Sequence, residues 1–362
     1  MTRRAFVHRF GMRAPDDVSA LLEAFATGEI DRKSIVAIFG KTEGNGLVND
    51  FTRALASRAL KDALGDVNAC LVMSGGTEGA LSPHVLVFEV REVDEASSAG
   101  ALAIGCAHTP DLPPESLGRL AQVDQVAAGV AAAMAAAGME SADQAHFVQI
   151  KCPLLTTGRV AAAEAEGRPL ATRDTLKSMG LSRAASSLGV AIALGEIDRA
   201  RLEDSAIGRD WSLYSSRASA SAGVELMNHE IVVLGVAPGW SGPLSIEHGV
   251  MQDAIDIEPV RGALARVGLA SPGQLSVAQR GRLVALLAKA EASSTGALRG
   301  YRHTMLNDSD ISSTRHARGF VAGALAALVG HAEIFVSGGA EHQGPDGGGP
   351  VAVIAHTGGM HD

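Results

Sequence analysis

The stretch Ser74-Gly-Gly-Thr-Glu78 recurs as Ser337-Gly-Gly-Ala-Glu341, and a relaxed form, Ser221-Ala-Gly-Val-Glu225, lies between them. Each copy is followed by a short run rich in Val and Ile, which is typical of a buried strand. These runs are 85–90, 231–236 and 351–355. The same order of motif and strand, met three times, predicts a chain built from three similar units. The middle copy departs most, because the segment before it is rich in Ser and not apolar.

A second element lies upstream of each motif, where an Arg precedes a Gly by twelve residues. The pairs are Arg53 with Gly65, Arg183 with Gly195, and Arg318 with Gly330. The residues between them are rich in Ala and Leu, and Gly commonly ends a helix. We therefore expect an outer helix in each unit, with the Arg in its first turn. The constant spacing selects Arg318 for this place and not Arg315.

A third element is a lysine that ends an apolar run. Lys41 ends the run 35–41 and Lys151 ends the run 147–151, and both runs are typical of strands. Lys289 ends the run 283–289, whose pattern fits a helix or a strand. Each unit thus contains, in order, a Lys, an Arg and the Ser-x-Gly-x-Glu motif.

These elements predict an α/β fold of three homologous repeat units around a pseudo-threefold axis, with β-structure inside and helices outside. We place the units at residues 1–103, 111–249 and 254–362. An Ala-rich helix that reaches about Ala137 is interpreted as an addition to the middle unit. Three such units would bring three Lys, three Arg and three Ser together at the centre.

The composition excludes several classes of protein. Of 362 residues, 46% are hydrophobic and 20% charged, which is typical of a globular chain and not of a disordered one. The net charge of -9 disfavours binding to nucleic acid or to an anionic membrane. Three widely spaced cysteines form neither a disulfide framework nor a zinc knuckle. The longest apolar run is too short to span a bilayer, so we expect a cytoplasmic protein.

The central set combines hydroxyl, ammonium and guanidinium groups. A lysine whose pKa is lowered by burial or by nearby cations can remove the proton of a serine, which then attacks a carbonyl carbon. Three similar carbonyl-binding pockets suit a six-membered ring with alternating carbonyls. Each element alone also has an ordinary explanation, since Ser-Gly-Gly is commonly a turn and an Arg or Lys commonly a surface charge. Only the threefold recurrence favours a site.

At these residues the chain resembles the cyanuric acid hydrolase and barbiturase family of ring-opening amidohydrolases, over essentially its whole length. The motifs that carry the resemblance are Gly40-Lys-Thr-Glu-Gly-Asn-Gly46, Met73-Ser-Gly-Gly-Thr-Glu-Gly79, Lys151-Cys-Pro-Leu-Leu-Thr156, Ser219-Ala-Ser-Ala-Gly223, Ser313-Thr-Arg-His-Ala-Arg318 and Val336-Ser-Gly-Gly-Ala-Glu-His-Gln-Gly-Pro345. The resemblance implies opening of cyanuric acid to carboxybiuret, which then loses carbon dioxide to give biuret.

The resemblance also implies roles for individual residues. Lys151 would be the general base and Ser221 the nucleophile, with Lys41 and Lys289 in support and Arg315 tuning specificity for the ring. Substrate would contact Arg53, Ser74, Gly75, Arg183, Ser221, Ala222, Arg318, Ser337 and Gly338. A structural Mg²⁺ or Ca²⁺ would be held by Glu291, Ala340, Gln343, Gly344, Pro345 and Gly348, mainly through the oxygen ligands that such cations prefer. The family further implies a homotetramer and no organic cofactor.

Two alternatives stay open. One is a barbiturase, with the same fold and mechanism but a pyrimidine ring as substrate. The other is a non-catalytic binding protein for a small trigonal or anionic ligand. A Ser-His triad is disfavoured, because none of the histidines near the motifs recurs at a constant place in the units. These histidines are His84, His303, His316 and His342.

Overall fold

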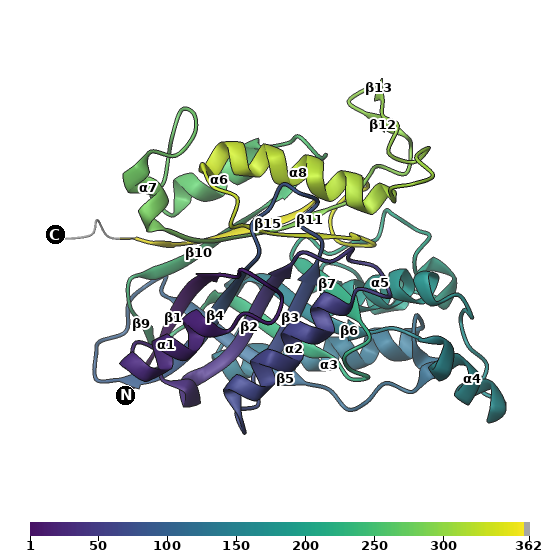
Figure 1. The fold of residues 1–362 in the computed structure, drawn as a ribbon, viewed down its shortest axis with the longest axis horizontal. Coiled ribbons are helices and arrows are strands. Elements are labelled where there is room, and N and C mark those ends of the chain that lie inside the picture. The colour runs from purple at the N-terminus through teal and green to yellow at the C-terminus, as the bar shows by residue number, and fades with distance from the viewer. Residues whose placement is uncertain (358–362) are drawn as a thin grey trace.

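A computed structural model describes residues 1–357, and the last five residues of the predicted third unit, 358–362, lie outside the described residues. The chain forms three mixed sheets with helices packed on them (Figure 1). The first sheet contains β1 (Thr2–Gly11), β2 (Ile35–Thr42), β3 (Cys70–Gly75), β4 (His84–Val93) and the short β9 (Trp240–Ser241). Their order across the sheet is β3-β2-β4-β1-β9.

The other two sheets repeat this order. The second contains β5 (Leu102–His108), β6 (Ala145–Pro153), β7 (Ala218–Gly223) and β8 (Glu230–Val236), and the third contains β10 (Leu244–Met251), β11 (Leu283–Ala290), β14 (Phe335–Gly338) and β15 (Gly349–His356). Their orders are β7-β6-β8-β5 and β14-β11-β15-β10. In every sheet the strand that carries the Lys is parallel to the strand that carries the Ser. It is antiparallel to the strand that follows the Ser strand in the chain, which is β4, β8 or β15.

The helices recur in the same way. One follows the first strand of each sheet: α1 (Ser19–Thr27), α3 (Leu120–Ala137) and α6 (Glu258–Arg266). A second joins the Lys strand to the Ser strand: α2 (Phe51–Leu64), α5 (Thr175–Ala193) and α8 (Ser313–Val329). Figure 1 shows α6 and α8 on the outer face of the third sheet, away from the other two sheets. The Ala-rich helix α3 is therefore the counterpart of α1 and α6, and its interpretation as an addition to the middle unit is wrong.

The remaining elements are short. They are α4 (Thr157–Ala165), α7 (Val277–Arg282), the hairpin of β12 (Ala297–Leu298) and β13 (Tyr301–Arg302), and five single 3₁₀ turns at Arg32–Ser34, Pro114–Ser116, Ala142–Gln144, Arg199–Arg201 and Asp204–Ala206. Helix α4 lies between the Lys strand β6 and the long helix α5. Among the described residues, the corresponding segments before α2 and α8 contain no helix.

The structure corrects the position of two arginines. Arg53 lies in the first turn of α2, which Asp50 caps by accepting a hydrogen bond from Thr52 N. Helix α5 begins eight residues before Arg183, and α8 begins five residues before Arg318. Both helices extend further toward the N-terminus than the twelve-residue spacing indicates, because their first turns hold polar residues outside the Ala-rich stretch. The ambiguous run that ends in Lys289 is a strand, β11.

Two strands lie outside the predicted residue range of the unit whose sheet they belong to. β5 lies outside the range 111–249, and β10 lies outside the range 254–362, although they pair with β8 and β15. Neither strand gave a strong signal, since one is rich in Ala and Gly and the other is interrupted by Glu, His and Gly.

The main hydrophobic core is shared between the sheets. Phe39 of the first sheet packs against Phe88 of the same sheet and Phe335 of the third, with ring centroids 4.6 and 5.9 Å apart. Helix α3 is long and apolar enough to cross a membrane, but it packs on β5, β8 and α5 with eight of its residues buried, as a core helix does.

Candidate active site

A small cavity lies where β3, β7 and β14 meet. It is lined by Gly46, Arg53, Ser74, Gly75, Met179, Arg183, Ser221, Ala222, Arg318, Ser337 and Gly338. All nine residues predicted to contact substrate are among these eleven. The structure adds Gly46 and Met179, which belong to a loop and to a helix face and carry no chemical signal in the sequence.

Strand register brings each Ser beside a Lys. Lys41 is directly opposite Ser74, Lys151 opposite Ser221, and Lys289 opposite Ser337. Residues opposite each other on neighbouring strands point to the same side of a sheet, so each pair faces the centre. The serines also meet across sheets, since Ser221 Oγ lies 3.0 Å from Ser337 Oγ.

The three buried ammonium groups make different contacts. Lys41 Nζ donates to Ser74 Oγ at 3.3 Å, and Lys289 Nζ donates to Ser337 Oγ at 3.2 Å. Lys151 Nζ instead donates to Met73 O of the first sheet at 2.7 Å and lies 3.4 Å from Glu225 Oε1. The pair predicted to be catalytic is thus adjacent in register, while its ammonium forms no hydrogen bond with its serine.

Burial makes these lysines candidates for a base. Desolvation, and then the charge of Arg183, lower the pKa of Lys289 to about 7. Desolvation followed by Arg318 lowers the pKa of Lys41 well below its ordinary value. The pKa of Lys151 is also lowered, chiefly by desolvation, although Glu225 opposes this shift. A neutral amine, which base catalysis requires, is therefore accessible at this centre.

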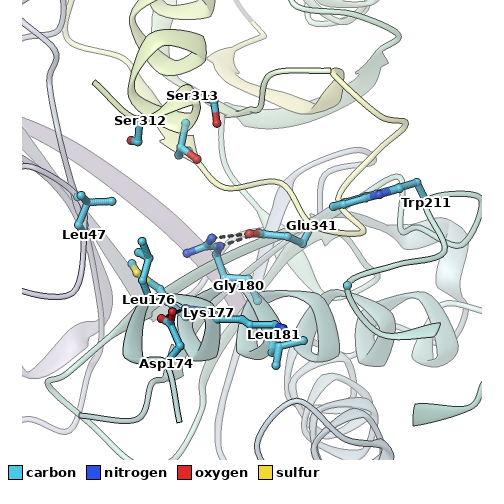
Figure 2. Close-up of a pocket in the computed structure, with 16 residues that line it drawn as sticks. Leu47, Asp174, Leu176, Lys177, Gly180, Leu181, Trp211, Ser312, Ser313 and Glu341 are labelled. Atoms are coloured by element: carbon cyan, nitrogen blue, oxygen red, sulfur yellow. Dashed lines mark hydrogen bonds and ion pairs between the residues drawn. The ribbon is translucent and has the colours of Figure 1, made fainter. Parts of the chain in front are cut away.

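The arginines join the sheets through the last residue of each motif. Arg53 Nε lies 3.8 Å from Glu225 Oε1, and Arg318 Nε donates to Glu78 Oε1 at 3.0 Å. Arg183 donates to both oxygens of Glu341, at 2.7 and 2.5 Å (Figure 2). The first unit thus pairs with the second, the second with the third, and the third with the first. The sequence alone gives these glutamates no role, although they recur as the last residue of the Ser-x-Gly-x-Glu motif.

The glycine of each motif leaves room for these ion pairs. A Cβ at Gly76 would lie 2.1 Å from Arg318 Nη2, and one at Gly339 would lie 2.5 Å from Arg183 Cζ. Both glycines have positive φ, at 93° and 77°. A Cβ at Gly223 would lie 1.7 Å from Glu225 Oε2. Close approach of charged side chains to the backbone therefore explains the third position of the motif.

Arg315 does not line the central cavity. Its Nε donates to Glu78 Oε2 at 2.9 Å, so it shares a carboxylate with Arg318 and faces a neighbouring surface pocket. The four histidines considered above are absent from the residues that line the central cavity within the described chain. His84 bonds to Ser82 O, His342 to Leu213 O and His316 to Asp308, so these three have structural partners.

The one carboxylate expected to hold a metal lies at the end of β11. Glu291 follows this strand, and the loop that contains Gly347 packs against Ser293, where a Cβ on the glycine would lie 2.8 Å from Ser293 Cβ. Burial and then the charge of Glu341 raise the pKa of Glu291. The described residues contain no cluster of three acidic, His or Cys side chains suited to a metal, so the ligands here would be one carboxylate and mainly carbonyl oxygens. That set fits a hard cation.

A larger cleft of about 510 Å³ adjoins the cavity and shares Gly46, Met179, Arg183 and Gly338 with it. Figure 2 shows Ser312 and Ser313, from the start of α8, on one side of this cleft and Asp174 and Lys177 of the α5 region on the other. Glu341, which accepts hydrogen bonds from Arg183, lies between them. The cleft adjoining the central cavity is therefore lined by these polar groups together with apolar side chains such as Leu47, Leu176 and Trp211.

Comparison with known proteins identifies relatives over nearly the whole chain. A family model described as amidohydrolase ring-opening protein matches residues 6–356. A cyanuric acid amidohydrolase of Bradyrhizobium sp. (strain ORS 375) is 62% identical, covering 97% of this chain and 98% of the relative. One of Azorhizobium caulinodans is 60% identical, covering 97% and 98%.

Solved structures give the same result. A crystal structure of the cyanuric acid hydrolase from A. caulinodans superposes with a TM-score of 0.90 at 58% identity, covering 98% of this chain and 99% of that one. Another cyanuric acid hydrolase, described as an evolutionary innovation by structural concatenation, gives a TM-score of 0.94 at 47% identity, covering 98% and 100%.

Proposed function

Since the chain belongs to the family of ring-opening amidohydrolases, we propose that it hydrolyses cyanuric acid. Water cleaves one ring C–N bond to give carboxybiuret, which then loses carbon dioxide to leave biuret. The observation that carries this proposal is the central cavity, in which three Ser from the three sheets and three Arg from helices α2, α5 and α8 surround one small space. A ring with three equivalent carbonyls matches three equivalent sets of donors.

The chemistry that we propose uses Ser221 and Lys151. Lys151 turns from Met73 O toward Ser221, accepts the hydroxyl proton as neutral amine, and Ser221 Oγ bonds to a ring carbonyl carbon. The ring C–N bond breaks, and the proton passes from Lys151 to the departing nitrogen. Water then releases the product from Ser221. Lys41 and Lys289 hold Ser74 and Ser337 as donors to the other two carbonyls.

The closed series of Arg–Glu pairs supports an arrangement of three units about a pseudo-threefold axis. Each arginine reaches the motif of the following unit, and the third reaches the first. The strands that pair favour units that begin near β1, β5 and β10. We also retain, as proposals, a cytoplasmic location and a homotetramer.

We further propose that Mg²⁺ or Ca²⁺ binds beside Glu291, with Ala340, Gln343, Gly344, Pro345 and Gly348. A cation there would neutralise a carboxylate that is buried near a second one. Chelation should lower the midpoint of thermal unfolding, and Mg²⁺ or Ca²⁺ should restore it, whereas Glu291→Gln protein should respond to neither. An unchanged midpoint in chelated wild type would contradict the site.

Turnover of cyanuric acid and barbituric acid, measured side by side, tests the function. We expect wild type to open cyanuric acid and Ser221→Ala to lose at least about 10³-fold in kcat, because the nucleophile is gone. Ser219→Ala is the matched control, since Ser219 is buried in the same strand but does not line the cavity. Opening of barbituric acid alone would make the protein a barbiturase. Binding of cyanuric acid without turnover of either ring would favour the binding protein.

A further inference from the structure

One glutamate of the three repeated motifs is paired differently from the other two. Glu341 accepts two hydrogen bonds from Arg183, and Glu78 accepts from Arg315 and Arg318. Within the described part of the chain, neither oxygen of the buried Glu225 accepts a hydrogen bond. Glu225 instead has Lys151 Nζ at 3.4 Å and Arg53 Nε at 3.8 Å.

The backbone at the motif glycine differs between the copies as well. Gly76 and Gly339 have positive φ, and their turns direct the following glutamates toward arginines. Gly223 does not take this conformation and is the last residue of β7. The Glu225 carboxylate lies over Gly223, and Lys151 Cε packs against the same glycine. Lys151 is also the one buried lysine of the described centre that forms an ion pair.

The lysine that meets this carboxylate belongs to the unit assigned the chemistry. When Lys151 takes the proton of Ser221, a buried ammonium forms, and a carboxylate nearby stabilises that charge. The third member of a catalytic triad acts on its base in this way. On the basis of the proposed function, we infer that Glu225 is a positioning residue that orients Lys151 and stabilises its ammonium. It thereby distinguishes the middle Ser-Lys pair from the other two.

Other titratable or charged groups also face Lys151, and substitution of Glu225 leaves them in place. Arg53 lies beside it from α2, and Cys152 follows it on β6. Glu230 of β8 is its strand partner and accepts a hydrogen bond from Leu71 N at 2.5 Å. Only Glu225 places a carboxylate oxygen within 4 Å of its ammonium in the described residues.

The pH dependence of kcat and kcat/KM for cyanuric acid tests the inference in Glu225→Gln. We expect kcat to fall about 10²-fold with KM nearly unchanged. The acid limb of the profile of kcat against pH should move about one pH unit lower, because the Lys151 ammonium loses its counter-charge and its pKa falls. The matched variant Glu78→Gln loosens Arg318 and should raise KM without moving that limb. Ionisation of the substrate contributes equally to all variants. An acid limb at the wild-type position in Glu225→Gln, or an equal displacement in Glu78→Gln, would overturn the inference.

Two further measurements cover the remaining outcomes. If Glu225→Gln does not fold, Glu225→Asp withdraws the carboxylate by one methylene and should move the limb in the same direction by less, so an unmoved limb argues against the role. NMR titration of ¹³C-labelled lysine side chains needs no turnover, and only six lysines contribute. The signal that Lys151→Arg removes should titrate at lower pH in Glu225→Gln. That result would stand even if wild type failed to open cyanuric acid.

Discussion

Lys41, Lys151 and Lys289 are three of only six lysines in the chain, and all three are buried beside the central cavity, while the other three are exposed. A buried ammonium is costly unless it is paired or loses its proton. Lys41 and Lys289 offset part of that cost through serine and carbonyl oxygens, and Lys151 does so through Glu225. The same residue type at the same strand position therefore has two different electrostatic environments.

Lys41 should make stability depend on pH. Its folded-state pKa lies below the unfolded value of about 10.4, so between these two values the unfolded chain binds the extra proton. The unfolding free energy of wild type, relative to Lys41→Met, should therefore rise with pH toward about 10.4, by up to about 1.4 kcal/mol per pH unit. Urea denaturation at several pH values from 7 upward measures this.

The control is Lys61→Met, which removes an exposed lysine of α2. The unfolding free energy of Lys61→Met should differ from that of wild type by the same amount at every pH from 7 upward. A constant difference for Lys41→Met would show that this ammonium keeps its proton in the folded protein.

Recurrence in the sequence predicted which Lys, Arg and Ser residues gather at the centre, because a repeated position must lie in a repeated environment. It did not reveal their partners. Nothing in the spacing shows that Arg183 reaches Glu341, since the pairing joins different units. Nor does the motif alone show that Gly223 differs in φ from Gly76 and Gly339, or that Glu225 lies 3.4 Å from Lys151 Nζ.

At the scale of elements, glycines set how closely helices approach. Gly189 of α5 lies against α3, and a Cβ there would be 2.7 Å from Val123 O. Gly105 of β5 lies under the same helix, and its Cβ would be 1.9 Å from Ala133 O. The Ala and Gly content that the sequence shows is thus used for close packing of α3. Strands rich in Val and Ile were predictable, whereas β5 was not, because its small residues serve this contact.

Two Gly→Ala substitutions in helix interiors should have opposite effects on stability. Gly323 of α8 is exposed with open space around it, so Gly323→Ala should stabilise by about 0.5–1 kcal/mol through helix propensity. Gly189→Ala gains the same propensity but forces α5 from α3, so it should destabilise by about 1–3 kcal/mol. Urea denaturation compares the two, and changes of the same sign would contradict this account of the packing.

At the scale of the molecule, the three sheets share one core. Residues of all three sheets belong to the same hydrophobic cluster, and Phe39 contacts both Phe88 and Phe335. The units predicted from the repeat are consequently not independent domains in the energetic sense. A repeat is visible in a sequence, but the area buried between its copies is not.

Calorimetry should therefore show one cooperative transition for the whole chain. Phe39→Ala should lower the midpoint of this transition and reduce the free energy of unfolding by about 3–5 kcal/mol, because removing the ring leaves a cavity between the sheets. Phe320→Ala is the control, since Phe320 is half exposed on α8 and should cost much less. Two or three separate transitions would mean that the units unfold independently.

The order in which arginines pair with glutamates has a historical consequence. Because each arginine reaches the glutamate of another copy, one copy alone would hold an incomplete cavity. An ancestor with a single copy would have needed three chains, with identical sites, to close the same cavity. Fusion of such chains into one would allow the copies to differ, so that one glutamate, Glu225, could contact a lysine in addition to its arginine.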